Sequence, residues 1–403
     1  MKWLVSLILL ATFSFAHAQA WKTLPKGVRI LGYRNVTTSK ISSNFNRTGG
    51  ESSLGTEVKL DGKTIDALSG YMLSQGLGMS QAGIDALQAG TYKVDAQAQF
   101  NVQGMGFGWG LTDKLMVYGE VAYYTAQIHA RLKRTAGNTY KETAQIEEKT
   151  GNASSGAVAP NLRSAPDITE NTIQSYITNG NGYKPLGDWY GTGYGDMETG
   201  LMYKAIDKGT TGLLLYPGVV LPTGRQDDPD ILQDVGFGDG QYDFFGEMAS
   251  GYLVNDALSF GSTFRYTYQA PTTKKLRVPT SRDNSLSNTK GDFTVKYGDK
   301  LNYMVNGTYK FNDWIAITPV YRFMYTAKSK YGSDFTAANQ ILAYNTDRME
   351  HQAQMTATFS SITPFLKKQF LLPAQVNINA VQTIAGRNVP KATRFEIEFR
   401  MLF

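Results

Sequence analysis

The stretch Thr-Arg-Phe-Glu-Ile-Glu-Phe-Arg-Met-Leu-Phe, residues 393–403, decides the fold. The odd-numbered positions from Thr393 to Phe403 are apolar except for Thr393 itself. The even-numbered positions between them include the charged residues Arg394, Glu396, Glu398 and Arg400. Successive side chains of a β-strand point to opposite faces, so a strand here has one apolar and one charged face. A helix would mix the charges with the phenylalanines on every side.

The same alternation recurs along the chain, for example in residues 94–103 and 370–379. It is typical of strands that cross a membrane, with apolar side chains toward lipid and polar ones toward the interior. A soluble two-sheet sandwich also alternates, but it does not need so many strands of this length. We therefore predict an all-β fold, a transmembrane antiparallel β-barrel of about 12 strands. The expected strands are 26–36, 93–110, 114–132, 192–206, 211–222, 239–254, 257–270, 298–311, 314–327, 348–360, 368–384 and 391–403.

The connections between these segments alternate in length. Short ones such as 112–114, 207–209, 255–256 and 312–313 hold Asp, Asn, Lys and Gly, which suit tight turns. Long ones cover about 37–92, 133–191, 223–238, 271–297 and 328–347. Outer-membrane barrels have short periplasmic turns and long extracellular loops. An even strand count with both termini in the periplasm places every long loop outside.

The first residues are typical of a secretory signal peptide. Lys2 precedes the apolar stretch 3–15, and small residues frame a cleavage site at 16–18 or 18–20. The alternative, a retained anchor, is disfavoured by that cleavage pattern. No later segment has the roughly 18 consecutive apolar residues of a membrane helix. We expect a signal peptide over 1–20 and a single outer-membrane β-barrel domain over 21–403, located in the outer membrane of a Gram-negative cell.

Composition excludes several classes of function. The chain has no cysteine, which rules out disulfides and thiolate chemistry, and its formal charge of +6 is dispersed rather than gathered into a nucleic-acid-binding stripe. Beyond the signal segment only His129 and His351 remain, and neither accompanies a serine motif of the kind a hydrolase requires. We expect no nucleic-acid partner, no enzymatic activity and no cofactor.

Two further patterns have structural and functional interpretations. Gly104, Gly106, Gly108 and Gly110 share one strand face, where missing side chains allow close approach of a neighbour or a bend. The acidic segment 227–243 has the carboxylates that Ca²⁺ prefers, yet it lacks EF-hand spacing. We interpret it as a solvated loop and expect no metal, with Ca²⁺ binding as the alternative.

The inward register carries charges of both signs. Two interpretations fit: a polar pore with charge-based selectivity, or pairing between strands that braces a narrow barrel. We favour bracing with a constricted channel. The expected lumen-lining residues are Asp95, Glu120, Glu198, Asp243, Glu247, Arg265, Lys310, Arg322, Glu350, Arg394, Glu396, Glu398 and Arg400.

Residues 190–270 carry a motif series. Gly193-Tyr194-Gly195-Asp196 is followed by the segment Leu-Pro-Thr-Gly at 221–224 and by Gly-Phe-Gly at 236–238. This order resembles the outer-membrane proteins grouped as the putative MetA-pathway of phenol degradation family. The resemblance covers about a fifth of the chain and implies a β-barrel transporter for small, often aromatic compounds.

Together these patterns predict an outer-membrane channel or transporter for passive uptake of a small molecule, hydrophobic or aromatic. The alternative is a sealed structural barrel whose large loops, near 37–92 and 133–191, bind a partner or another cell. The same loops could instead fold into the lumen or cap it. Expected partners are outer-membrane lipid and lipopolysaccharide, the solute, and the barrel assembly machinery, since the terminal Phe403 resembles its recognition signal.

Overall fold

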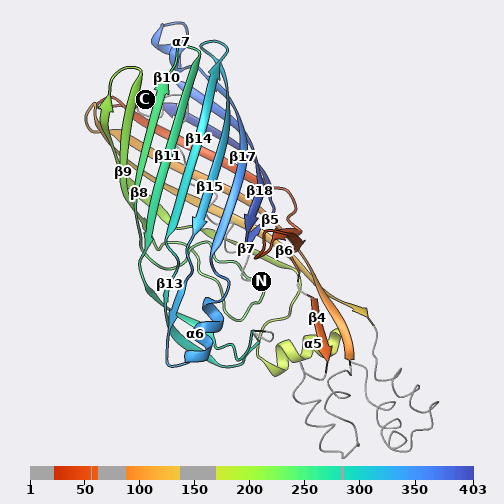
Figure 1. The fold of residues 1–403 in the computed structure, drawn as a ribbon. Helices are drawn as coiled ribbons and strands as arrows, with labels where there is room; N and C mark the ends of the chain where they lie inside the picture. The colour runs from red at the N-terminus through yellow and green to blue at the C-terminus, as the bar shows by residue number, and fades with distance from the viewer. Residues whose placement is uncertain (1–21, 56, 62–87, 137–168, 283–285) are drawn as a thin grey trace, which may run out of the picture.

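Twelve antiparallel strands close into a barrel in the computed structural model, which describes residues 22–55, 57–61, 88–136, 169–282 and 286–403 (Figure 1). Around the barrel the order is β5-β1-β20-β18-β17-β15-β14-β11-β10-β9-β8-β6, and pairing of β5 with β6 completes the ring. The predicted fold class and strand number are confirmed. The strands are β1 (Arg29–Thr38), β5 (Gln88–Gly110), β6 (Leu115–Ala136), β8 (Met197–Asp207), β9 (Thr211–Leu221), β10 (Asp243–Leu253), β11 (Leu258–Gln269), β14 (Lys300–Lys310), β15 (Ile315–Thr326), β17 (Arg348–Ser360), β18 (Ala374–Arg387) and β20 (Thr393–Leu402).

The strand β20 shows why the sheet closes. Phe395, Ile397 and Phe399 are 60%, 56% and 40% exposed on the outer wall, whereas Glu396 and Glu398 are buried inside. β20 pairs with β1, and Arg29 and Phe403 exchange two backbone hydrogen bonds of 2.8 and 3.0 Å at the end of that pair. Every strand edge of the barrel is thereby satisfied within the chain, as a hydrocarbon environment requires.

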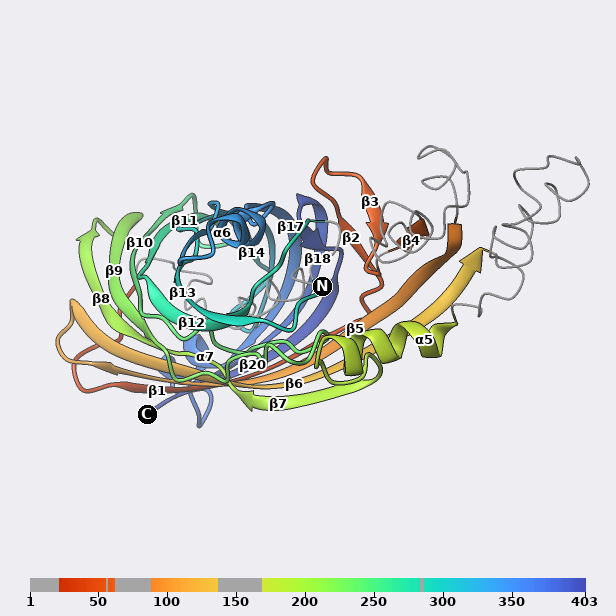
Figure 2. The same cartoon turned by 90° about the horizontal axis from the view of Figure 1, so that it is seen from below.

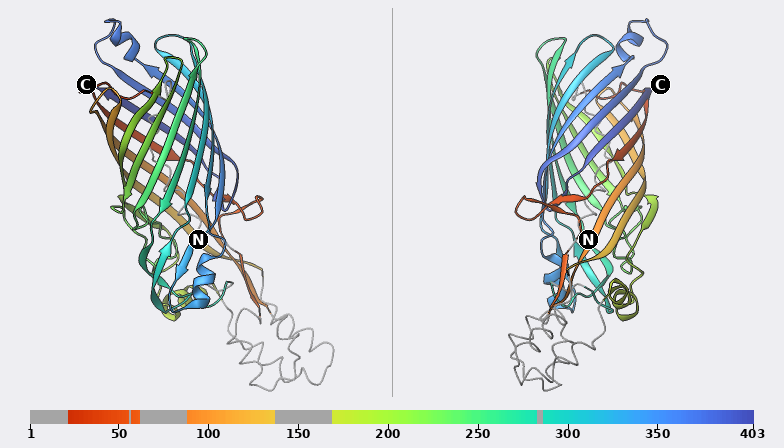
Figure 3. Two further views of the ribbon diagram at one scale, coloured as in Figure 1. Left: turned by 60° about the vertical axis from the view of Figure 1, so that its left-hand side comes forward. Right: turned by 90° about the vertical axis from the view of Figure 1, so that its right-hand side faces the viewer.

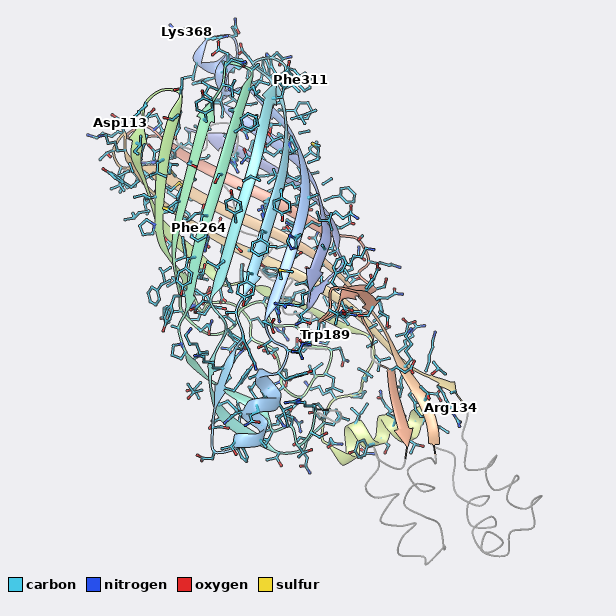
Figure 4. The ribbon with its side chains drawn as sticks, viewed as in Figure 1. Asp113, Arg134, Trp189, Phe264, Phe311 and Lys368 are labelled. Carbon is cyan, nitrogen blue, oxygen red and sulfur yellow. The ribbon has the colours of Figure 1, made fainter. Side chains whose placement is uncertain are left out.

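One end of the barrel carries the short turns and the other carries the long connections (Figures 1 and 4). Asp113, Phe311 and Lys368 lie at the first end and Arg134 at the second. Side chains build the turns: Asn255 and Asn312 each accept two backbone N–H groups that follow them, at 2.8–2.9 Å. The short turns and the long connections therefore lie at opposite ends of the barrel, as predicted. In outer-membrane barrels the end with the short turns is the periplasmic one.

The turn between β17 and β18 is longer than expected. It holds the short helix α7 (Ile362–Leu366), and β18 begins at Ala374, so the predicted strand start at 368 is wrong. Pro373 has no N–H for the sheet ladder, and Lys368 has a positive φ of 59°, so alternation alone could not extend the strand through them.

A second correction concerns the predicted strand 192–206. It is divided at Gly195 and Asp196 into β7 (Trp189–Tyr194) and β8, both of which pair with β6. The predicted strand 239–254 likewise begins only at Asp243. The break at 195–196 belongs to the site described below.

The extracellular connections include a folded cap (Figures 2 and 3). The strands β12 (Thr272–Arg277), β13 (Lys290–Lys296) and β16 (Lys330–Gly332) form a small sheet, and helix α6 (Thr336–Ala343) packs on it. Its core is Val278, Phe293, Val295, Ala338 and Leu342. The cap therefore has a hydrophobic core of its own at the mouth of the barrel.

The remaining elements lie at the extracellular end. The strands β2 (Ser43–Phe45), β3 (Glu51–Ser53) and β19 (Val389–Pro390) form a second small sheet, and β4 (Glu57–Asp61) pairs with the first residues of β5. Helix α5 (Glu170–Ser175) runs into a π-helical turn over Tyr176–Gly180. None of the helices in the described ranges is long and apolar enough to cross a membrane. The predicted signal peptide over 1–20 lies outside the described residues, and so do residues 62–87 and 137–168 of the predicted loops near 37–92 and 133–191.

Candidate functional site

A layer of paired charges lies inside the barrel. Arg265 of β11 donates two hydrogen bonds to Glu198 of β8, at 3.0 and 2.7 Å, and its guanidinium lies 3.7 Å from Glu247. The hydroxyl of Tyr118 donates to the same Glu198 at 3.0 Å, and Arg265 stacks over the ring of Phe245. The three charged groups are mostly shielded from solvent, so they are held by one another rather than by water.

A second cluster sits along β20 and its neighbours. Glu396 is fully buried and accepts hydrogen bonds from Arg34, from Arg394 at 2.6 Å and from Asn379 at 3.1 Å. Two residues further along, Arg400 donates to Glu398 at 2.8 Å. These contacts join β1, β18 and β20, so they cross-link the seam where the chain closes the barrel.

The structure places most of the predicted lumen residues on the inner face of the wall. Glu350 is half-buried and accepts hydrogen bonds from Gln352 and Thr383, at 2.7 and 2.8 Å. Glu247, Lys310 and Arg322 are half-buried too. The inner-face residues are Glu120, Glu198, Asp243, Glu247, Arg265, Lys310, Arg322, Glu350, Arg394, Glu396, Glu398 and Arg400.

Asp95 is the exception, and the prediction for it is wrong. Its side chain is exposed on the outside of β5 beside Lys133 at 3.8 Å. The buried face of this part of β5 is the apolar one, where Phe100 and Val102 pack with Ile41 and other loop residues. β5 and β6 extend beyond the rest of the wall, and the outer side of this extension faces water. The apolar side chains of this part of β5 therefore point inward and the polar ones outward.

The glycines of β5 lie on the same inner face. All four, Gly104, Gly106, Gly108 and Gly110, are buried. A Cβ on Gly108 would lie 2.8 Å from Met116 and 2.9 Å from Ile30. At Gly108 the missing side chain therefore permits close packing of neighbouring strands.

A cavity of about 290 Å³ occupies the extracellular part of the lumen beneath the cap. Its wall combines apolar and aromatic side chains with charged ones from the barrel and the loops. The apolar part comprises Ala122, Tyr124, Val220, Phe237, Leu276 and Leu342, and the polar part includes Asp196, Asp239, Asp243, Gln269, Lys274, Lys300 and Arg348. Ten of the lining residues are charged, and apolar and aromatic side chains lie among them, a mixture that suits a small molecule with both polar and apolar parts.

The residues of the motif series meet at one side of this cavity. The Asp196 carboxylate accepts the backbone N–H of Gly224 at 2.8 Å and that of Asp239 at 3.2 Å. A Cβ on Gly238 would lie 2.4 Å from that carboxylate, so only glycine fits there. Sequence reasoning found these motifs only through a family resemblance and gave Asp196 no role. The structure shows that they anchor the loop 222–242 at the barrel mouth.

Phe237, in that loop, contacts the barrel wall. Its ring stacks on Tyr124 of β6, with centroids 5.2 Å apart and planes 7° apart. Arg225 lies over Phe237 and over Trp189, at 5.5 Å in each case. The loop thus brings a fully buried aromatic ring into the wall of the cavity.

Most carboxylates of the acidic segment 227–243 are paired with basic residues, either from the same loop or from other loops and strands. Asp234 receives two hydrogen bonds from Arg225, at 2.9 and 2.7 Å, and Asp230 pairs with Arg277 at 2.6 Å and with Lys290 at 2.5 Å. Asp227, Asp228 and Asp243 pair with Lys274, Lys184 and Lys300 respectively. Among the described residues no acidic or histidine cluster is arranged to hold a metal ion. The segment is a tethered lid rather than a freely solvated loop.

Asp239 differs from its neighbours. Burial is the main cause that raises the pKa of Asp239 to about 6; Lys300 opposes this, while Asp243 and Asp196 add to it. Burial also raises the pKa of Asp196. The charge of the cavity therefore changes near neutral pH.

The two histidines in the described part of the chain lie outside this site. His129 is on the outer side of β6, 3.0 Å from Asp188, and His351 faces outward beside the hydroxyl of Tyr321 at 2.6 Å.

A closed barrel with an apolar outer wall and a charged lumen defines the protein as an outer-membrane β-barrel. No family model matches the sequence, and no curated protein matches it significantly. Among solved structures, an outer-membrane channel from Pseudomonas putida F1 is similar, with a TM-score of 0.53 and 11% identity over 95% of this chain and 98% of that chain. The Pseudomonas putida toluene transporter TodX is less similar, with a TM-score of 0.32 and 11% identity over 94% and 89%. At 11% identity, the similarity to the Pseudomonas putida F1 channel shows a shared fold only. The resemblance of residues 190–270 to the MetA-pathway family therefore stays a prediction.

Proposed function

We propose that the protein is a passive outer-membrane channel for a small molecule with an aromatic or other apolar part. The observation that carries this proposal is the cavity beneath the cap. Its volume of about 290 Å³ lies at the lower edge of the roughly 300–1,000 Å³ of ligand pockets, so it suits one ring with short substituents rather than a long chain.

The cavity wall supports an aromatic solute. Tyr124 and Phe237 lie in the wall with their rings stacked on each other, and Leu276 and Leu342 add aliphatic side chains from the cap. Aromatic side chains favour offset or edge contacts with a further ring. A polar substituent on the solute would find Gln269 and Lys300 as hydrogen-bond donors on the barrel wall.

The charge layer supports a constricted channel rather than an open pore. The pair of Arg265 and Glu198 and the cluster around Glu396 project into the lumen from opposite arcs of the barrel. A solute that leaves the cavity toward the periplasm has to pass these fixed charges. Slow passage of small solutes, rather than bulk diffusion of hydrophilic ones, follows from such an arrangement.

Two measurements test the proposal together. Planar-bilayer recordings of the purified protein should show small single-channel currents that an added aromatic solute such as phenol reduces in a concentration-dependent manner. Cells that lack general porins should accumulate a radiolabelled aromatic solute faster when they express the protein. Absence of both conductance and solute flux would reject a channel.

The partners follow from the same proposal. Lipopolysaccharide and phospholipid surround the outer wall, and the assembly machinery recognises β20 during insertion. The alternative of a sealed surface-interaction barrel predicts that deletion of the large loops near 37–92 and 133–191 abolishes cell contact and leaves solute uptake unchanged.

A further inference from the structure

The periplasmic turn 361–373 carries an unusual exposed apolar surface. Leu371 is 89% exposed, Leu366 74%, Leu372 55% and Phe370 47%, all within a few residues of one another. A monomeric protein seldom leaves such a group of large apolar side chains in water without a function. The other short turns present mainly Asp, Asn, Lys and Gly at this end of the barrel.

The backbone of this turn is well fixed. Ser361 accepts the backbone N–H of Phe365 at 2.8 Å through its carbonyl, and its own N–H donates to Ala374 at 2.8 Å. The Ser361 hydroxyl donates to Leu372 at 2.5 Å, and the N–H of Gln369 donates to Pro364 at 2.8 Å. The exposed leucines therefore project from a closed, hydrogen-bonded scaffold.

The apolar surface continues into the lipid-facing wall. The ring of Phe370 meets Trp314 edge-on, with centroids 5.2 Å apart, and Trp314 belongs to the neighbouring turn between β14 and β15. Phe311 and Phe359, 58% and 46% exposed, lie at the periplasmic ends of β14 and β17. Aromatic rings at this level are typical of the girdle at the membrane interface.

The charges beside the leucines match lipid headgroups. Lys367 and Lys368 lie next to them, Lys367 pairs with Asp313 at 2.5 Å, and Lys368 stands at the periplasmic rim (Figure 4). Segments that lie in a membrane interface place apolar side chains roughly 5–10 Å into the headgroup and acyl boundary and keep lysines on the polar side.

We propose that the turn 361–373 is an interfacial anchor, whose leucines enter the periplasmic leaflet of the outer membrane and whose Lys368 contacts phospholipid phosphates. The occupant of the apolar surface is phospholipid rather than a periplasmic protein, because the surface joins the barrel's own lipid-facing belt through Phe370 and Trp314. This anchor is independent of the solute and of the channel function.

The absence of native cysteine makes a direct test possible. Leu371→Cys and, separately, Leu366→Cys are spin-labelled and reconstituted in vesicles of phosphatidylethanolamine and phosphatidylglycerol. Collision rates with oxygen, which enters lipid, and with a nickel chelate, which stays in water, are then measured. Ile397→Cys on the lipid-facing wall and Asp256→Cys in the polar turn between β10 and β11 are the matched references.

We expect both leucine positions to resemble Ile397→Cys, with oxygen contact well above nickel contact. Nickel contact as high as at Asp256→Cys would overturn the proposal and favour a soluble periplasmic partner. Shielding from both reagents would overturn it too, because it would mean burial against protein. Heat-dependent migration on gels confirms that each variant is folded before it is measured.

Discussion

Arg265 and Glu198 form a two-point ion pair inside the barrel, although β9 and β10 separate their strands. The pair is mostly shielded from solvent, and Glu247 and Tyr118 complete its surroundings. It links β8 and β11 directly, whereas backbone hydrogen bonds connect these two strands only through β9 and β10. The contact therefore braces this part of the wall from its inner side.

Removing one member of this pair should destabilise the barrel. In Arg265→Ala the carboxylates of Glu198 and Glu247 lose their shared cation, and breaking a buried pair typically costs about 3–5 kcal/mol. The temperature at which the folded band converts to the unfolded band on gels should fall clearly. Lys133→Ala, which breaks an exposed pair with Asp95, is the control and should leave it unchanged. Equal behaviour of the two variants would mean that the buried pair does not brace the barrel.

The cluster at the seam should set ion selectivity. Glu396→Gln removes the carboxylate shared by Arg34 and Arg394 and leaves their positive charges less compensated. We expect the reversal potential in a salt gradient to move toward anion preference. Glu51→Gln, which removes an exposed charge paired with Lys391 outside the lumen, should not move it. An unchanged reversal potential in Glu396→Gln would mean that the ions do not pass close to this cluster.

The charge of the cavity should depend on pH through Asp239. Its pKa is raised to about 6, so the folded protein binds this proton more tightly than the unfolded chain. The resulting stabilisation is complete below about pH 4, near the unfolded value, and is lost as pH rises through about 6. Over the same range the cavity gains a negative charge, so cation preference should increase between about pH 5 and about pH 7.5.

The Asp239→Asn variant separates this effect from its surroundings. Asp196, Asp243, Lys300, Gln269 and Gln241 face or contact Asp239 and remain in place. The variant should show a much smaller change of reversal potential with pH, whereas Asp292→Asn on the exposed side of the cap should behave like the original protein. A full pH response in Asp239→Asn would assign the titration to another group.

Arg277 should hold the extracellular loops together. It bonds to Asp230 at 2.6 Å and to the carbonyls of Asn181, Gly182 and Ser287 at 2.7–2.8 Å, and it lies over the ring of Tyr183. Arg277→Ala should make the loop 222–242 accessible to protease on intact cells. Arg277→Lys should have a smaller effect of the same kind, because the lysine ammonium cannot replace all the hydrogen bonds of the planar guanidinium. Lys275→Ala, an exposed neighbour, should leave cleavage unchanged. Equal resistance of all variants would show that the lid is held elsewhere.

The fold was predictable because period-2 alternation and loop lengths are local properties of the chain. Thr393–Phe403 alone defines an inner and an outer face, and the alternation of short and long connections orders the strands. The inner charges of β20 follow from the same register. Asp95 was misplaced because the alternation tells which residues share a face but not where the membrane ends, and β5 continues beyond it.

The site was less predictable because it depends on contacts between distant segments. The joining of Asp196 to Gly224 and Asp239 spans up to 43 residues, and the stacking of Phe237 on Tyr124 spans more than a hundred. The basic partners Lys184, Lys274 and Arg277 of the acidic segment come from two other connections. Only the glycines at 224, 236 and 238, where close approach excludes a side chain, hinted at this arrangement.

Passage of solute through the cavity beneath the cap can be measured by blocking the cavity from inside. Asn302 lines the cavity, and the next residue, Tyr303, faces outward on the same strand. Single cysteines at these positions are treated with a bulky methanethiosulfonate reagent during bilayer recording and during uptake of a labelled aromatic solute. We predict that modification of Asn302→Cys reduces both current and uptake, reversibly with a reducing agent, and that modification of Tyr303→Cys changes neither. Full current and uptake in modified Asn302→Cys would show that solute does not pass through this cavity.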